Sequence, residues 1–97
     1  MALFIVTCLD KPSSLELRLA TRPDHLAYIR RCGQGVKLAG PILSDPERRP
    51  IGSHFIVDVA DLEEAKAFAQ QDPYALVGLF ESQVIHPFQI TIGALVE

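Results

Sequence analysis

The chain has little excess charge of either sign and no cluster of basic residues. Nine Lys and Arg stand against twelve Asp and Glu among 97 residues, for a formal net charge of −3. The only cationic doublets are Arg30-Arg31 and Arg48-Arg49. Because a phosphate backbone is bound by a concentrated basic surface, we expect no nucleic acid partner.

Long apolar runs are also absent. Crossing a bilayer takes roughly 20 consecutive apolar residues, whereas the apolar run at the N-terminus ends at Asp10-Lys11. No basic segment precedes that run and no small-residue cleavage site follows it, which argues against a signal peptide. A first β-strand accounts for it better, so we expect a cytoplasmic protein without a membrane partner.

Cysteine is scarce, and neither of the two cysteines has the spacing of a metal site or a redox motif. Cys8 falls in an apolar segment and Cys32 on the apolar face of an expected helix. We interpret both as reduced, buried thiols. The histidines His25, His54 and His86 lack short ligand spacing, and we expect no metal ion and no cofactor.

Two other catalytic signatures are missing. Neither Ser44 nor Ser53 lies in a Gly-x-Ser-x-Gly nucleophile elbow, which argues against a serine hydrolase. Gly33-Gln34-Gly35 follows an expected helix rather than a strand, so it is not a phosphate-binding loop.

Strand and helix patterns alternate along the chain. The expected strands are 2–9, 36–43, 53–59 and about 79–92, the last broken at Pro87, and the expected helices are about 23–32 and 61–71. The order β-α-β-β-α-β is the split βαβ arrangement of a ferredoxin-like α+β fold. It implies a four-stranded antiparallel sheet with both helices on one face. The length fits one domain over 1–97.

Local signals predict where the elements begin and end. Pro23 has the favoured first-turn position of a helix, so Leu15–Ala20 is expected to be a separate turn or an irregular lead-in. Asp61 and Glu64 have the spacing of a capping box. Pro41 lacks an amide donor, which predicts an edge or a bulge in the second strand.

The expected fold leaves one face of the sheet without helices. We assign to that face the apolar side chains of Phe55, Val57, Val84, Phe88 and Ile90. A contiguous exposed apolar surface usually marks an interface. The sequence therefore predicts a homodimer that pairs the open faces.

His25 and Asp72 offer the most specific chemistry. At helical spacing, His25 aligns with Ile29 and Cys32 and faces the sheet. If the fold brings Asp72 to His25, the carboxylate would orient the imidazole as a general base and favour its charged form, which the dipole of the first helical turn disfavours. Taken alone, a core-facing histidine is more often structural, and Asp72 suits a cap for the turn at Pro73. One carboxylate oxygen could cap while the other faces His25.

Further side chains are candidates for substrate binding or for the border of the pocket. Tyr74 either supplies a hydroxyl to a pocket or packs against the sheet. Arg22 either holds a substrate carboxylate with two hydrogen bonds or is solvated. Ser44 and Ser53 bracket the polar loop 44–50, which we expect to border the pocket.

Several motifs together resemble the YCII-related proteins. They are Arg22-Pro23-Asp24-His25-Leu26, Ala39-Gly40-Pro41, Asp61-Leu62-Glu63-Glu64-Ala65, Asp72-Pro73-Tyr74 and the closing Val84-Ile85-His86-Pro87-Phe88. The resemblance implies a ferredoxin-like subunit of the dimeric α/β-barrel superfamily, with a histidine–aspartate site carried here by His25 and Asp72. Many members of the family have no assigned reaction. His86 stands where the family more often has Lys or Arg, so an anion bound there would meet a charge that depends on pH.

These observations predict a small, cofactor-independent lyase or isomerase. His25 and Asp72 would move a proton during elimination or isomerisation of a small cyclic or carbonyl-containing compound, as some relatives in the superfamily do. Two alternatives remain open: a non-catalytic module that binds a small metabolite or another protein, and a His25–Asp72 pair that is only structural.

Overall fold

The computed structural model describes residues 2–95. In chain order the elements are β1 (Ala2–Asp10), α1 (Leu15–Cys32), the 3₁₀ turn η1 (Gly33–Gly35), β2 (Val36–Leu43), β3 (Pro50–Val59), α2 (Leu62–Gln71), α3 (Pro73–Leu76) and β4 (Phe80–Pro87). Within the described residues, no helix has the length and apolar character needed to cross a membrane.

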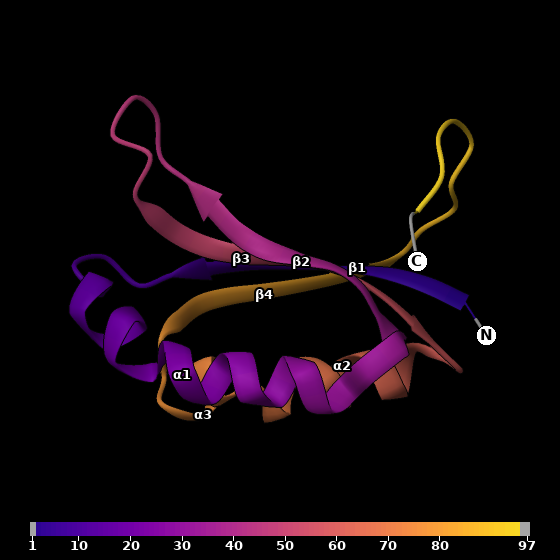
Figure 1. Ribbon diagram of the computed structural model, residues 1–97, viewed down its shortest axis with the longest axis horizontal. Helices are drawn as coiled ribbons and strands as arrows, with labels where there is room; N and C mark the ends of the chain where they lie inside the picture. Colours follow the sequence, from indigo (N-terminus) through magenta and orange to yellow (C-terminus); the bar gives the residue numbers. More distant parts are fainter. Residues whose placement is uncertain (1, 96–97) are drawn as a thin grey trace.

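The strands form one antiparallel sheet in the order β2-β3-β1-β4. All helices cover one face of this sheet, as Figure 1 shows. The predicted ferredoxin-like α+β fold is therefore confirmed. Pro41 lies in β2, which is an edge strand as its missing amide donor predicted.

The core lies between the sheet and α2. Directly paired residues of antiparallel strands share a face, and Val6 pairs with Phe55 while Phe4 pairs with Val57. All four are buried, together with Cys8 of β1 and Ala65, Phe68 and Ala69 of α2. The assignment of Phe55 and Val57 to the open face is wrong, because alternation along a strand separates two faces but does not say which one the helices cover.

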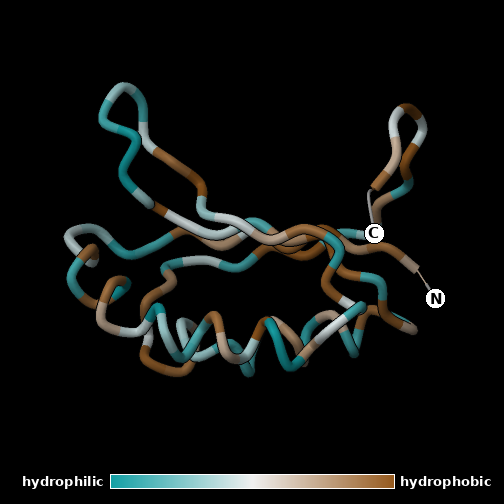
Figure 2. Tube along the Cα trace, in the orientation of Figure 1, coloured by the Kyte–Doolittle hydropathy of each residue, from teal (hydrophilic) through white to brown (hydrophobic). Residues whose placement is uncertain are grey.

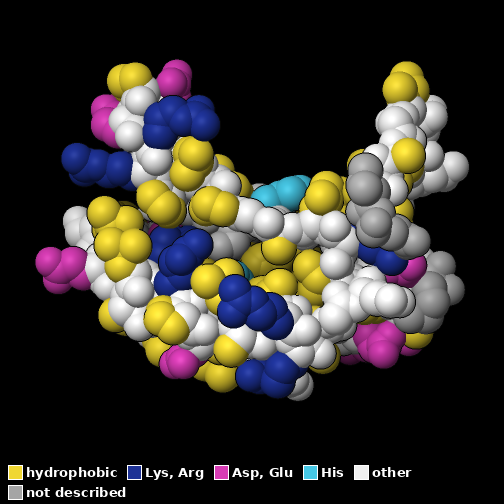
Figure 3. All heavy atoms as spheres, in the orientation of Figure 1, with side chains coloured by type: hydrophobic (Ala, Val, Ile, Leu, Met, Phe, Trp, Pro, Cys, Tyr) yellow, Lys and Arg dark blue, Asp and Glu magenta, His cyan; other side chains and the backbone are white. Residues whose placement is uncertain are grey.

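The open face carries a different set of side chains. Thr7 of β1 pairs with His54 of β3 and Val84 of β4, and Ile5 pairs with Ile56 and His86. The Thr7 hydroxyl lies 3.1 Å from Nδ1 of His54. Histidine atoms are visible on this face in the space-filling view of Figure 3.

Two arms rise from the rim of the open face on the side away from the helices (Figure 1). One is the β2–β3 hairpin, whose tip is hydrophilic, and the other is the segment 88–95, which is mostly hydrophobic (Figure 2). The last strand ends at Pro87 rather than continuing to 92, so Ile90 lies in the C-terminal arm. Together the arms give this face the shape of a saddle.

Helix α1 differs most from its prediction. It is one continuous helix of 18 residues with Pro23 inside it, not a lead-in followed by a helix that begins near Pro23. Its buried side chains are polar, namely Arg18, Thr21 and His25. Its apolar contribution to the core is limited to Tyr28, Ile29 and Cys32 near its C-terminal end, which are partly buried. His25 lies in the middle of the helix, so the expected effect of an N-terminal dipole on its charge does not apply.

Helix α2 begins as predicted. The Glu64 amide donates to Oδ1 of Asp61 over 2.9 Å, and the Glu64 carboxylate reaches back to the amide of Ala60. The helix ends at Gln71, before Pro73. Leu62, the first residue of the helix, is 38% exposed.

Candidate active site

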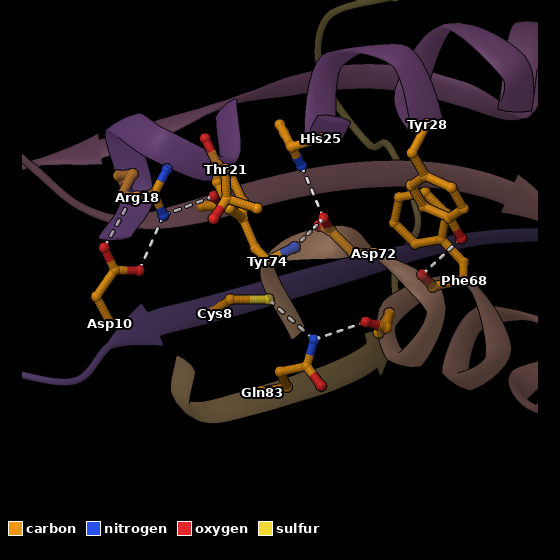
Figure 4. Close-up of polar contacts among 12 residues, drawn as sticks. Cys8, Asp10, Arg18, Thr21, His25, Tyr28, Phe68, Asp72, Tyr74 and Gln83 are labelled. Carbon is orange, nitrogen blue, oxygen red and sulfur yellow. Dashed lines mark hydrogen bonds and ion pairs between the residues drawn. The ribbon is translucent and has the colours of Figure 1, made fainter. Parts of the chain in front are cut away.

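The centre of the site is a contact between α1 and the junction of α2 with α3. Nδ1 of His25 lies 2.8 Å from Oδ1 of Asp72, and both side chains are buried. Figure 4 shows His25 descending from α1 onto the carboxylate. The two residues are 47 positions apart in the chain, and the fold brings them together as the sequence suggested.

Asp72 also caps the short helix α3. Its Oδ1 accepts a hydrogen bond of 3.0 Å from the Tyr74 amide, which has no partner inside the helix. The expected capping role is therefore confirmed. The same oxygen contacts His25 and caps, although the sequence suggested a division between the two oxygens. This double contact fixes the direction from which His25 meets the carboxylate.

Tyr74 lies between His25 and Arg18 (Figure 4). Its ring is stacked on the imidazole at 4.1 Å between centroids, and the Arg18 guanidinium carbon lies 4.5 Å from the ring centre. Burial raises the pKa of Tyr74 above its ordinary value, while the positive charges of Arg18 and Arg22 act in the opposite direction. The phenol is therefore neutral near pH 7 and can donate a proton in a hydrogen bond.

Arg18 is the residue that the sequence analysis missed. Its Nε and Nη2 donate to the two oxygens of Asp10 over 2.7 and 2.9 Å, and Nη2 also donates to Ser53 Oγ over 2.9 Å. Ser53, expected at a pocket mouth, is thus tied into this network. The spacing of Arg18 and His25, seven residues apart on one helix, was the available signal, but a helix beginning at Pro23 excluded Arg18.

These side chains line a pocket of about 230 Å³ between α1 and the β2–β3 edge of the sheet. Its lining consists of Arg18, Leu19, Arg22, His25, Leu26, Ile29, Ala39, Gly40, Pro41, Pro50, Ser53 and Tyr74. The volume suits a compound with one small ring, since sites for larger organic ligands begin near 300 Å³.

The other residues predicted to bind substrate lie in different parts of the structure. Arg22 lines the pocket. Ser44 lies in the β2–β3 arm, where its hydroxyl accepts from the Arg49 amide, and only Pro50 of the loop 44–50 reaches the pocket. His86 pairs with Ile5 on the open face, so within one subunit the sheet separates it from His25.

The geometry gives His25 a defined chemical capacity. A carboxylate at Nδ1 holds the proton on that nitrogen in the neutral ring, which leaves the lone pair on Nε2. Among residues 2–95, Nε2 has no hydrogen-bond partner, and His25 lines the pocket. The ring can therefore accept a proton from a bound molecule while Asp72 stabilises the charge that forms.

Other reactive groups lie outside the pocket. Cys8 and Cys32 are free, as predicted, although Cys32 is only half-buried. Burial raises the pKa of Cys8 to about 11, so its thiol is protonated near pH 7. Over residues 2–95, no group of three His, Cys, Asp or Glu side chains could hold a metal ion together.

The chain is similar in sequence to known proteins over most of its length. Protein YciI of Escherichia coli is 35% identical over 94 residues, which cover 90% of this chain and 96% of that protein. An uncharacterised protein of Haemophilus influenzae is 32% identical over 93 residues, covering 89% and 95%.

Among solved structures, 5-chloro-2-hydroxyhydroquinone dehydrochlorinase (TftG) of Burkholderia phenoliruptrix, in complex with 2,5-dihydroxybenzoquinone, superimposes with a TM-score of 0.81. It is 27% identical, over 90% of this chain and 93% of that chain. An antibiotic biosynthesis monooxygenase with a TM-score of 0.58 and 12% identity, over 95% of this chain and all of its own, shares the fold alone. The family model of the YCII-related domain matches residues 2–89, and the chain belongs to this family.

Proposed function

We propose that the protein is a cofactor-independent enzyme that moves a proton with His25 and Asp72 to eliminate a leaving group from, or isomerise, a small cyclic compound. The observation that carries the proposal is the orientation of His25, with Nδ1 held 2.8 Å from a buried carboxylate while the ring borders a pocket. A histidine needed only for packing would gain nothing from a border with the pocket.

The likeness to TftG supports this reaction class. That enzyme is a dehydrochlorinase and its structure holds 2,5-dihydroxybenzoquinone, a planar ring of the size that the pocket here accommodates. Elimination of this kind transfers a proton to a base while the leaving group departs with its bonding electrons. No oxidant or reductant is consumed, so an oriented base and a neutral donor such as Tyr74 suffice for the chemistry.

In the proposed mechanism, Nε2 of His25 accepts the proton from the bound compound and Asp72 stabilises the imidazolium. Stacking on Tyr74 holds the imidazole plane, and Arg18 holds Tyr74 from the other side. The positive charge of Arg22 favours negative charge that develops on the substrate. Leu26 and Ile29 add apolar side chains to the lining against which a ring can pack.

The test is chloride release from 5-chloro-2-hydroxyhydroquinone and turnover of a panel of substituted hydroquinones and small lactones. We expect His25→Gln to lower kcat by about 10²–10⁴, the usual contribution of a positioned base. The variant should still fold and keep the molecular mass of the wild type. The matched control is His54→Gln, because His54 lies on the opposite face of the sheet.

Turnover retained by His25→Gln would contradict the role of His25. If the wild type binds members of the panel without turning any over, the pocket belongs to a binding module. If the wild type shows no turnover and His25→Gln lowers the free energy of unfolding by several kcal/mol, His25 and Asp72 form a structural ion pair.

We also propose that a second copy of this chain covers the open face of the sheet. Leu9, Leu38 and Val84 on this face are each more than 40% exposed, and the two arms flank it (Figure 1). Apolar exposure distributed across one face of a sheet favours an interface between subunits.

We expect light scattering after gel filtration to give the mass of a dimer for the wild type and of a monomer for Val84→Glu. The control Leu76→Glu alters a side chain that is 71% exposed but lies on the helix side, and it should remain dimeric. A wild type that is monomeric at every concentration would overturn the proposal.

A further inference from the structure

The charged side chains that line the pocket are arginines, and none is acidic. Arg18, Arg22 and His25 border it, while no Asp or Glu belongs to its lining among the described residues. The two buried carboxylates of the region, Asp10 and Asp72, lie behind Arg18 and His25. A ligand in the pocket therefore meets positive groups first.

The two arginines differ in how their charge is balanced. Arg18 is buried, and Asp10 already neutralises it through two hydrogen bonds. Arg22 is exposed, and no carboxylate among residues 2–95 lies within ion-pair distance of it. The unbalanced positive charge at the pocket is consequently that of Arg22.

The position of Arg22 relates this charge to the proposed chemistry. Arg22 and His25 are three residues apart on α1, so their β-carbons lie about 5–6 Å from each other on one side of the helix. A group bound by Arg22 would thus lie in the same pocket and on the same side of the helix as His25. The apolar residues Leu26, Ile29 and Pro41 border the space between α1 and β2, where a flat ring fits.

We infer that the pocket selects monocyclic organic anions, with Arg22 binding a carboxylate or an ionised enol or phenol oxygen close to the reacting position. This inference rests on the proposed function for the choice of reacting atom, but its binding part does not require turnover. Guanidinium groups bind such oxygens through pairs of charge-assisted hydrogen bonds. Water competes less with these hydrogen bonds in a partly enclosed site, where the attraction between opposite charges is stronger.

The test is titration calorimetry with benzoate, its neutral analogue benzamide, salicylate and 2,5-dihydroxybenzoquinone. We expect the wild type to bind benzoate about 10- to 100-fold more tightly than benzamide, as a charge-assisted contact would give. Arg22→Gln should abolish this preference and Arg22→Lys should retain part of it. The matched control is Arg30→Gln, because Arg30 is an exposed arginine on α1 outside the pocket lining.

Equal affinity of the wild type for benzoate and benzamide would overturn the inference, as would a preference that survives Arg22→Gln. Failure of all three anions to bind would overturn it as well. His25→Gln separates the two proposals: a variant without turnover that still prefers benzoate leaves the anion site standing. A wild type with turnover and no preference for anions refutes the anion site alone.

Discussion

Replacing Asp10 by Ala is expected to lower the free energy of unfolding by about 3–5 kcal/mol, the usual cost of removing one partner of a buried ion pair. The guanidinium of Arg18 is 4% exposed and the Asp10 side chain 6%. Burial by itself would lower the pKa of Arg18, but the hydrogen bonds and the charge of Asp10 raise it above its ordinary value. Without Asp10, a buried and permanently charged group would have lost its counter-charge.

The measurement is urea unfolding, followed by circular dichroism, of three variants. Asp10→Ala should be the least stable, and the double variant Asp10→Ala/Arg18→Met should recover most of the loss because the unpaired charge is gone. Glu63→Ala removes an exposed carboxylate that pairs loosely with Lys66 and should change stability by less than about 0.5 kcal/mol. Equal effects of Asp10→Ala and Glu63→Ala would contradict the account of Arg18 given above.

Phe55→Ala should cost about 3–5 kcal/mol through the cavity that it leaves in the core. Phe55 is 1% exposed, and its ring meets Phe68 edge-on at 5.2 Å between centroids and His25 at 5.9 Å. The substitution therefore removes packing contacts with Phe68 of α2 and with the imidazole of His25. We expect weaker ligand binding in addition to the loss of stability.

Thermal and urea unfolding measure the first effect, and calorimetry with benzoate measures the second. Leu76→Ala is the control, because Leu76 is 71% exposed, and it should alter stability by no more than about 0.5 kcal/mol. A loss at Phe55 below about 1 kcal/mol would show that the neighbouring side chains collapse into the space, and that Phe55 does not support His25.

Much of the fold follows from short-range signals. The alternation over Ser53–Val59 identifies β3, the capping box of Asp61 and Glu64 starts α2, and Pro73 ends it. These features depend on neighbouring residues, which a sequence displays directly. The resemblance to the YCII-related proteins also predicted the site of His25 and Asp72, which the fold brings together.

What the sequence concealed depends on tertiary contacts. Pro23 favours a helix start locally, yet α1 continues through it because residues on both sides of it contact the rest of the protein. Arg18 and Asp10 lie eight positions apart on different elements, and this spacing does not predict that they form a bidentate ion pair. The side of the sheet on which Phe55, Val57 and His86 lie follows from strand register, which alternation alone does not supply.

The polar side of α1 that faces the interior has a consequence for how the helix is held on the sheet. Helices usually pack on a sheet through buried apolar side chains. The buried side chains of α1 are instead Arg18, Thr21 and His25, its apolar Tyr28, Ile29 and Cys32 are only partly buried, and the helix borders a hollow of about 230 Å³. The contact between α1 and the sheet is therefore not fully filled by apolar side chains. A ring bound in the hollow would pack against the helix and the sheet as a core side chain does. A ring bound in the hollow should therefore oppose local opening of α1 and join helix and sheet into one cooperative unit.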